Sequence, residues 1–202
     1  MDMTVASALY LQVKILGGFV AVLWGLELVD TLLLRGWLNQ FGILPRRWRG
    51  LRGVLLAPLL HRDLRHLTTN TVPLVVLGGL ILWQSTSLFL LVTAGVWLLG
   101  GLGVWFLGGR NSNHIGASGL VFGYLGFLLA QGFFEQSGAA IALSLIAGLL
   151  YGSTLWGILP FQRGVSWQGH LFGCLVGGAI SRYQAPLQQW FLSLTHWVNL
   201  WI

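Results

Sequence analysis

Six long apolar segments dominate this sequence of 202 residues. They cover residues 15–34, 67–83, 88–107, 116–134, 139–159 and 167–180. A helix needs about 20 apolar residues to cross the roughly 30 Å of hydrocarbon in a bilayer. Charged residues make up only 8% of the chain, too few to cover a surface that faces water. The sequence therefore predicts an all-α membrane protein, a bundle of six transmembrane helices within residues 15–183.

The two ends of the chain fall outside these segments. Residues 1–14 are expected to form a short N-terminal segment without a cleavable signal peptide, because they have no basic start. Polar and apolar side chains then alternate at helical spacing in residues 184–202: Gln189, Ser193, His196 and Asn199 stand opposite Trp190, Leu194, Trp197 and Trp201. This pattern favours an amphipathic helix on the membrane surface over a seventh span.

The connection between the first two segments, residues 35–65, is long and basic. It holds seven arginines and two tryptophans: Arg35, Arg46, Arg47, Arg49, Arg52, Arg62, Arg65, Trp37 and Trp48. The chain has a formal net charge of +6. Because the arginines stand between apolar runs, they indicate contact with the anionic headgroups of the lipid bilayer and no nucleic-acid partner. We expect this first loop to lie on the membrane surface as short amphipathic pieces.

Few acidic residues are available for chemistry. Glu27 and Asp30 share one face of the first helix. We expect them near the end of that span, paired with loop arginines, and a proton relay is the alternative. Asp63 follows Arg62 just before the second segment, which favours helix capping or a salt bridge over catalysis. The one cysteine, Cys174, excludes an internal disulfide and is expected to be a small buried hydrophobe.

Four polar residues stand at the starts of alternate segments. His66 and Asn70 open the second segment, Ser118 opens the fourth, and His170 lies one turn into the sixth. Since consecutive spans alternate in direction, these three starts lie on the same side of the membrane. Polar side chains at such positions are by default a functional hypothesis. The sequence therefore predicts one polar cluster on one side of the bundle.

Small residues give a reason for the fourth and sixth segments to touch. In the fourth segment Gly116, Gly119, Gly123 and Gly126 line one helix face, and in the sixth Ser166, Gly173 and Gly177 do nearly the same, with His170 on that face. Two such faces can approach closely, which would bring Ser118 and His170 within hydrogen-bond reach. The alternative is that the glycines serve packing alone and Ser118 bonds a neighbouring helix carbonyl.

A serine beside a histidine can carry acyl transfer, since the histidine acts as the base that the weak hydroxyl nucleophile needs. No acid is well placed to orient the histidine, so the pattern indicates a Ser-His dyad. His66 and Asn70 lie four residues apart on one helical face, and both can donate hydrogen bonds to an oxyanion, as can the Ser118 N–H. Their spacing is also a weak metal-ligand pattern, but it lacks the carboxylate of a zinc protease helix. We expect neither a metal nor another cofactor.

This combination resembles the rhomboid family of intramembrane serine proteases. Three motifs carry the resemblance: His61 to Asn70 (HRDLRHLTTN), Gly116 to Gly119 (GASG), and Gly169 to Gly173 (GHLFG) with Gly177 beyond. The resemblance implies that Ser118 is the nucleophile, that His170 is the general base and acid, and that His66, Asn70 and the Ser118 amide form the oxyanion hole.

The resemblance also assigns supporting residues. It implies that His61 braces the first loop and that the aromatic one turn after the nucleophile, here Phe122 in place of the common tyrosine, stacks on the histidine. Gly116, Gly119 and Gly173 belong to the matching motifs. Where the family often has a Trp-Arg pair nine residues before the position of His61, this chain has Arg52-Gly53.

The implied function is an endopeptidase that cleaves single-span membrane proteins near the extracytoplasmic face of a bacterial plasma membrane. A catalytically silent relative that binds membrane clients is the alternative, and a small-molecule transporter is disfavoured because the polar residues gather near one face. The family topology places nine arginines outside, including Arg110 and Arg163, and leaves Lys14 and Arg182 inside. The positive-inside rule predicts the opposite orientation in the membrane. We expect the orientation of the family, because arginine side chains can reach lipid phosphates on either face.

Overall fold

The computed structural model describes residues 5–161 and 164–199. Every regular element in these residues is helical. In chain order the elements are α1 (Val5–Val29), η1 (Asp30–Leu34), η2 (Trp37–Phe41), α2 (Trp48–Leu56), η3 (Ala57–Leu59), α3 (Leu64–Gln84), α4 (Thr86–Gly95), η4 (Val96–Gly100), α5 (Gly101–Leu107), α6 (Ser118–Phe134), α7 (Gly138–Tyr151), η5 (Gly152–Ile158), α8 (Trp167–Arg182) and α9 (Gln184–Asn199).

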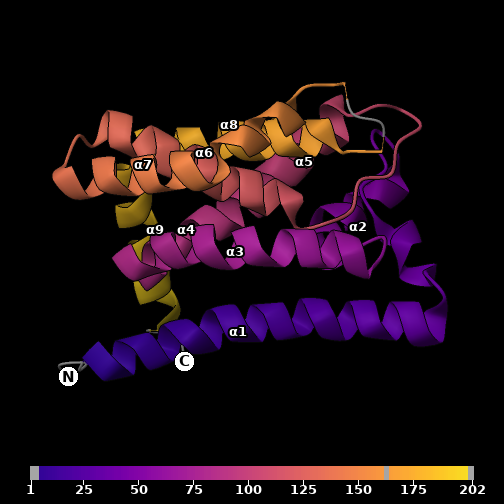
Figure 1. Ribbon diagram of the computed structural model, residues 1–202, viewed down its shortest axis with the longest axis horizontal. Coiled ribbons are helices and arrows are strands. Elements are labelled where there is room, and N and C mark those ends of the chain that lie inside the picture. Colours follow the sequence, from indigo (N-terminus) through magenta and orange to yellow (C-terminus); the bar gives the residue numbers. More distant parts are fainter. Residues whose placement is uncertain (1–4, 162–163, 200–202) are drawn as a thin grey trace.

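All six predicted apolar segments are helical. Four helical runs are long and apolar enough to cross a membrane: Leu9–Leu34, Leu64–Gln84, Thr86–Leu107 and Gly138–Ile158. The other two, α6 with 17 residues and α8 with 16, are shorter. The long helices run side by side, with α2 and the first loop at one end of the bundle and α9 across the other (Figure 1).

The chain before residue 15 does not form a separate segment in its described part. The helix of α1 begins at Val5, ten residues before the predicted start of the first span. No glycine or proline interrupts residues 5–15, and Gln12 anchors this part of the helix by donating from Nε2 to the carbonyl oxygen of Leu82, at 3.1 Å. The helix therefore continues through the predicted boundary.

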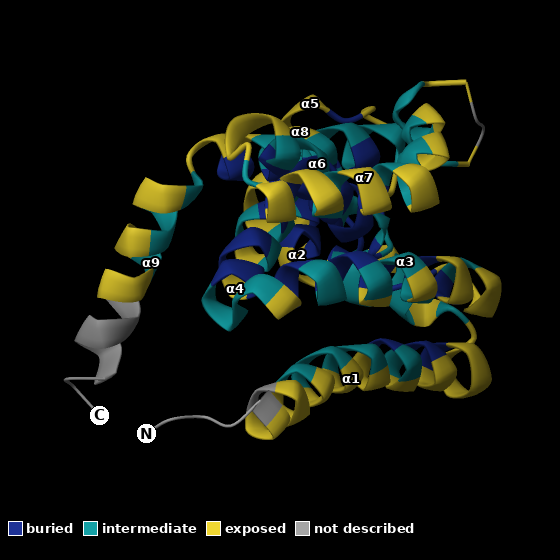
Figure 2. Cartoon of the chain, turned by 60° about the vertical axis from the view of Figure 1, so that its left-hand side comes forward, coloured by how far each residue is buried: buried dark blue, intermediate teal, exposed yellow. Residues whose placement is uncertain are grey.

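Helix α6 occupies the centre of the bundle. All of its residues from Leu120 to Leu128 are buried, as expected of a helix that is apolar on every side. Its one buried hydroxyl in this stretch, on Tyr124, bonds the Thr93 hydroxyl of α4 at 2.9 Å. In Figure 2 the buried residues lie in the interior of the bundle, and the outward faces of α1 and α7 are exposed.

The predicted contact between the fourth and sixth segments is confirmed. A Cβ atom on Gly173 of α8 would collide with the carbonyl oxygen of Gly119, and one on Gly177 would collide with that of Gly123. In the other direction, a Cβ on Gly126 would collide with the carbonyl oxygen of Cys174. The two helices therefore touch backbone to backbone, which only bare glycine positions allow.

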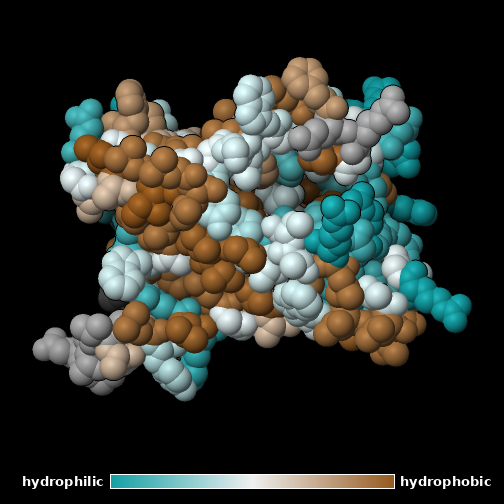
Figure 3. All heavy atoms as spheres, viewed as in Figure 1, coloured by the Kyte–Doolittle hydropathy of each residue, from teal (hydrophilic) through white to brown (hydrophobic). Residues whose placement is uncertain are grey.

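The first loop forms the short pieces expected of it. Helix α2 turns one face inward, where Gly50 lies against the backbone of Leu44 and Gly53 against that of Gly42. Its other face exposes Trp48 and Arg52. Hydrophilic residues gather towards the end of the molecule that carries α2, and apolar residues cover much of the remaining face in Figure 3.

Arg46 anchors the first loop to the end of α5. Its guanidinium donates to the carbonyl oxygens of Phe106 and Gly108, both at 2.8 Å, and its own N–H donates to the carbonyl oxygen of Trp105. These carbonyls are among those that a helix leaves without partners at its C-terminal end. In this chain Arg46 thus ties the loop to the bundle, whereas Arg52 stacks over the Phe41 ring at 4.5 Å.

The expected pairing of Glu27 and Asp30 with loop arginines is wrong in the described residues. Both side chains are buried, with 3% of their surface exposed. An Asp30 carboxylate oxygen accepts from the Leu38 N–H at 2.8 Å, and a Glu27 oxygen accepts from the Thr31 hydroxyl at 2.9 Å. Asp30 therefore shapes the turn that leaves α1, where a backbone N–H and not an arginine is close enough to bind it.

The described part of the tail, residues 184–199, is the helix α9. Leu187 and Phe191 of α9 pack against the hydrophobic core. Trp201 of the predicted amphipathic pattern lies outside the described residues, as do residues 1–4 of the N-terminal segment and Arg163 of the turn before α8.

Candidate active site

Ser118 is the first residue of α6, and the segment before it is held by the first loop. The N–H of Gly116 donates to the carbonyl oxygen of Ala57 at 2.9 Å. The N–H of Ala117 donates to Nε2 of the buried His61 at 3.2 Å, and burial lowers the pKa of His61 to about 3. His61 is thus a neutral acceptor that connects the first loop to the residue before Ser118.

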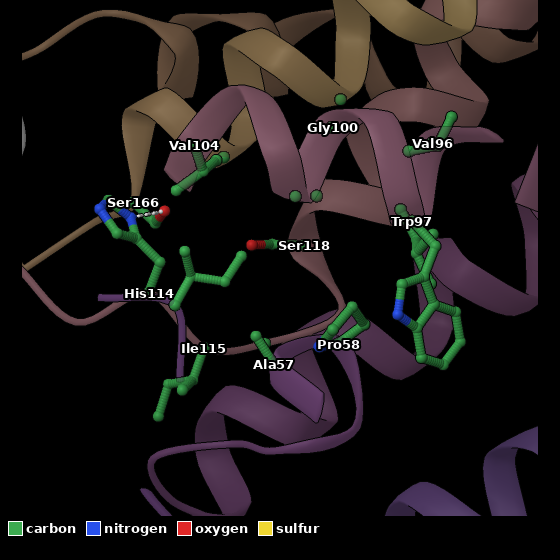
Figure 4. Close-up of a pocket in the computed structure, with 17 residues that line it drawn as sticks. Ala57, Pro58, Val96, Trp97, Gly100, Val104, His114, Ile115, Ser118 and Ser166 are labelled. Atoms are coloured by element: carbon green, nitrogen blue, oxygen red, sulfur yellow. Dashed lines mark hydrogen bonds between the residues drawn. The ribbon is translucent and has the colours of Figure 1, made fainter. Parts of the chain in front are cut away.

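A small cavity of about 50 Å³ opens beside Ser118. Its wall includes Ser118, His114 and Ser166, and it continues along Gly100 and Trp97. The Ser118 hydroxyl points into this space towards the side where His114 and Ser166 lie (Figure 4). A π-helical segment, η4, forms part of the wall, a distortion that is frequent at functional sites.

His170 is held in one orientation by two neighbours. Its Nδ1 lies 2.9 Å from the carbonyl oxygen of Gly157. A carbonyl oxygen only accepts, so Nδ1 carries the proton and Nε2 keeps its lone pair when the ring is neutral. The ring stacks on Phe122, with centroids 4.0 Å apart and planes 5° from parallel. The imidazole is therefore oriented with Nε2 available as a base.

No hydrogen bond joins the Ser118 hydroxyl to His170 among the described residues. The two residues belong to helices in backbone contact, since a Cβ on Gly173, three residues after His170, would collide with the carbonyl oxygen of Gly119, the residue after Ser118. Bonds between a catalytic hydroxyl and its base are often long in free enzymes and tighten when a substrate binds. The structure thus brings the two helices together and leaves the hydroxyl directed at the cavity.

His66 and Asn70 converge on Gly116. A Cβ built on Gly116 would lie 2.8 Å from Nε2 of His66 and 3.5 Å from Nδ2 of Asn70. Gly116 also has a φ of +116°, which side-chain-bearing residues rarely adopt. Nδ1 of His66 accepts from the Arg62 N–H at 3.4 Å, so Nε2 carries the proton of the neutral ring. Two donors therefore face the same glycine.

One of these donors has no partner. Nδ2 of Asn70 is buried and makes no hydrogen bond within the described structure. A buried donor without an acceptor is costly, and native structures keep few of them. An acceptor supplied by a ligand, such as the oxygen of a polarised carbonyl, would satisfy it.

Asp63 caps α3. Its Oδ1 accepts from the His66 N–H at 2.7 Å, and its Oδ2 pairs with Arg62 at 3.4 Å on the surface. The bond from the His66 N–H, followed by that from Arg62, holds the pKa of Asp63 below its usual range. The sequence predicted that Asp63 caps a helix or forms a salt bridge, and the structure confirms both roles.

Two elements of the site were not predicted from the sequence. The orienting partner of His170 is a backbone carbonyl, that of Gly157, and backbone atoms leave no sequence signal. His114 is buried beside Ser118 and bonds Ser112 and Ser166. A histidine four residues before a candidate nucleophile was a visible signal, but only the fold shows that it reaches Ser166.

Comparison with known proteins identifies the family. The sequence model of the Rhomboid domain matches residues 46–186. The chain belongs to the rhomboid family. The matched range contains the first loop from Arg46 onward and all the candidate residues from His61 to Gly173.

Several mycobacterial proteins are similar to this rhomboid chain. Uncharacterized proteins of Mycobacterium bovis and Mycobacterium tuberculosis are each 46% identical over 173 residues, which is 82% of this chain and 71% of theirs. An uncharacterized protein of Mycobacterium leprae is 42% identical over 173 residues, 82% of this chain and 68% of its own. These relatives share the family and carry no stated activity.

Proposed function

We propose that this protein is an intramembrane serine endopeptidase in which Ser118 is the nucleophile and His170 the general base and acid. The orientation of His170 carries the proposal. Gly157 holds Nδ1 and Phe122 holds the ring plane, which leaves Nε2 as the proton acceptor on a helix that touches the helix of Ser118. A Ser-His pair of this kind can catalyse acyl transfer without a carboxylate if another group orients the base.

The geometry supports the following steps. Ser118 Oγ attacks the carbonyl carbon of the scissile peptide while His170 Nε2 takes its proton. The oxyanion that forms accepts hydrogen bonds from His66 Nε2–H, Asn70 Nδ2–H and the Ser118 N–H, the last at the start of α6 where N–H groups lack intrahelical partners. His170 then protonates the leaving amine. A water molecule hydrolyses the acyl-enzyme by the same route in reverse.

We propose single-span membrane proteins as the substrates. We place six spans in the bilayer: α1 with η1, α3, α4 to α5, α6, α7 with η5, and α8. Helix α6 has 17 residues and is about 26 Å long, so that Ser118 lies near one membrane surface. We propose that this is the extracytoplasmic face of a bacterial plasma membrane, with the arginines of the first loop among lipid phosphates and α9 at the opposite surface.

The alternative of a silent relative that only binds membrane clients has less support. Both residues whose loss would mark such a protein, Ser118 and His170, are present. An unpartnered Asn70 donor that faces Gly116 is also of use to an oxyanion and of little use to a binding surface for apolar helices.

A serine-reactive phosphonate probe tests the proposal. The purified protein in detergent micelles should become labelled on Ser118, and in liposomes it should cleave a reporter protein that has one transmembrane helix. Ser118→Ala and His170→Ala should each abolish labelling and cleavage while the protein still inserts and folds. Ser193→Ala, at an exposed serine of α9, is the matched control. Cleavage by Ser118→Ala at the normal rate would exclude the proposed nucleophile.

A further inference from the structure

His114 links two parts of the site that lie far apart in the sequence. Its ring is buried, with 6% of its surface exposed. Nε2 lies 2.6 Å from the Ser112 hydroxyl, and Nδ1 lies 2.5 Å from the Ser166 hydroxyl. Ser112 belongs to the same loop, whereas Ser166 is the residue before α8. The second bond therefore joins the segment before Ser118 to the segment before His170 (Figure 4).

The direction of each bond follows from the hydrogen that each group holds. The Ser112 hydroxyl donates its one hydrogen to the carbonyl oxygen of Gly109 at 2.6 Å, so it can only accept from His114. Nε2 of His114 must then carry the proton, and in a neutral imidazole Nδ1 is left as an acceptor. Ser166 is therefore the donor to Nδ1. Burial, followed by the nearby His170, lowers the pKa of His114 to about 4, so the ring is neutral at pH 7.

Ser166 connects His114 to the first turn of α8. Its carbonyl oxygen accepts from the N–H of His170 at 3.1 Å, the bond that closes the first turn of the helix. Its hydroxyl is not available to cap α8, because it is directed at His114. Any movement of Ser166 thus moves the turn that carries His170.

The helix contact by itself fixes the first turn of α8 less firmly than the turns that follow it. Gly173 and Gly177 lie directly against backbone oxygens of α6, so those turns have no freedom to separate or slide. One turn before Gly173 the contact is looser, because a Cβ on Gly119 would lie 3.5 Å from the carbonyl oxygen of Gly169, an ordinary distance. The cavity beside Ser118 opens at this level. A hydrogen bond across the gap supplies the constraint that packing lacks.

We propose that His114 is a positioning residue of the Ser118–His170 site, acting through the Ser166 hydroxyl to hold the first turn of α8 against the nucleophile loop. The inference rests on the proposed protease function. His114 itself touches no reacting atom. Its loss lowers the rate of the chemical step and leaves substrate binding nearly unchanged.

Two substitutions separate the two bonds of His114. The side-chain oxygen of asparagine can occupy the place of Nδ1, so His114→Asn keeps an acceptor for Ser166 and loses the Ser112 bond. Glutamine reaches the place of Nε2, so His114→Gln keeps a donor to Ser112 and loses the Ser166 bond. We expect kcat for reporter cleavage in liposomes to fall about tenfold or more in His114→Gln and less than threefold in His114→Asn, with KM within twofold in both, since small displacements of catalytic groups act on the chemical step.

Ser166 provides the second half of the test. Ser166→Ala should lower kcat as much as His114→Gln does. Ser166→Thr should keep most of the wild-type kcat, because threonine also has a hydroxyl. The double variant His114→Gln/Ser166→Ala should have a kcat no lower than that of either single variant. Ser193→Ala is the matched control for serine removal. Equal rates for His114→Asn and His114→Gln, or additive effects in the double variant, would overturn the proposal.

A measurement without catalysis separates this proposal from the proposed function. In ¹⁵N-histidine NMR spectra of the detergent-solubilised protein, His114 should give the neutral Nε2–H tautomer at pH 7, and its Nδ1 signal should shift in Ser166→Ala and not in Ser193→Ala. An unlabelled Ser118 in the wild-type protein would refute the protease function and leave this bond standing. An Nδ1–H tautomer, or an Nδ1 signal that is insensitive to Ser166→Ala, would refute the bond itself.

Discussion

Gly177→Ala should separate α6 from α8 and disturb the proposed Ser118–His170 dyad two turns away. A Cβ on Gly177 would lie 2.9 Å from the N atom of Phe127, with the carbonyl oxygen of Gly123 closer still, whereas ordinary contact begins at 3.4 Å. The helices must therefore move apart by at least 0.5 Å at this point. The obstacles are backbone atoms, which cannot rotate away as a side chain could.

The size of the effect follows from two opposing terms. Overpacking of this kind typically costs about 1–3 kcal/mol, and a gap of 0.5–1 Å between helices gives up about a quarter to a half of each dispersion contact along it. Replacing glycine by alanine within a helix returns about 1 kcal/mol. We expect a net loss of up to about 2 kcal/mol, which lowers the thermal midpoint by up to roughly 8 °C for a chain of this size.

The neighbouring Gly178 gives a matched control. A Cβ there would meet its nearest atom, Cβ of Ala130, at 3.8 Å, so Gly178→Ala gains the same helix propensity without a clash. Thermal unfolding in detergent micelles should show Gly178→Ala as stable as the wild type or more so, and Gly177→Ala as less stable. Phosphonate labelling of Ser118 should slow about tenfold or more in Gly177→Ala alone. Equal midpoints and equal labelling rates in the two variants would refute the argument from backbone contact.

Three further predictions concern single interactions. Phe122→Tyr should keep the ring stacked on His170 and leave kcat for reporter cleavage within about twofold. Phe122→Leu should lower kcat about two- to tenfold, because the aromatic pair is lost. Reporter cleavage in liposomes measures kcat for both variants. Arg46→Gln should remove the cap on α5 and increase hydrogen exchange throughout the first loop, at a cost of about 1–3 kcal/mol, whereas unchanged exchange would show that other contacts anchor the loop. His61 and His114 have folded pKa values depressed from 6.5 to about 3 and about 4, so the unfolded chain binds protons that the folded chain does not. These two histidines should leave the free energy of unfolding unchanged above pH 6.5. Between pH 6.5 and 4 each should lower it by about 1.4 kcal/mol per pH unit. Chemical unfolding at several pH values should show that the free energy of unfolding depends less steeply on pH in His114→Asn than in the wild type.

The sequence was sufficient to predict the helices and the contact between two of them. Apolar length located the six segments, and the glycine repeat that ends at Gly177 predicted which two would touch. The helix start at Val5 was missed because apolar length marks the part of a helix that needs lipid, and a helix can continue beyond it. The partners of Glu27 and Asp30 were missed for another reason. Charge complementarity suggested arginines, but a buried carboxylate binds the donor that the local turn presents, here a backbone N–H and a hydroxyl.

Within the candidate site, the sequence indicated which side chains have the required chemistry but not what orients them. The orienting groups are mostly backbone atoms: the carbonyl of Gly157 directs His170, the N–H of Ala117 engages His61, and the carbonyl of Ala57 holds the loop before Ser118. Every residue offers the same carbonyl and N–H, so no residue type marks these positions. The proposed Ser118–His170 dyad is an example. None of the five acidic residues was well placed to orient His170, and the group that does bond its Nδ1 is a backbone carbonyl. A backbone carbonyl can orient a base reliably only where its own segment is held, and Gly157 packs against the stacked pair: a Cβ there would lie 3.1 Å from the Phe122 ring and 3.2 Å from Nδ1 of His170.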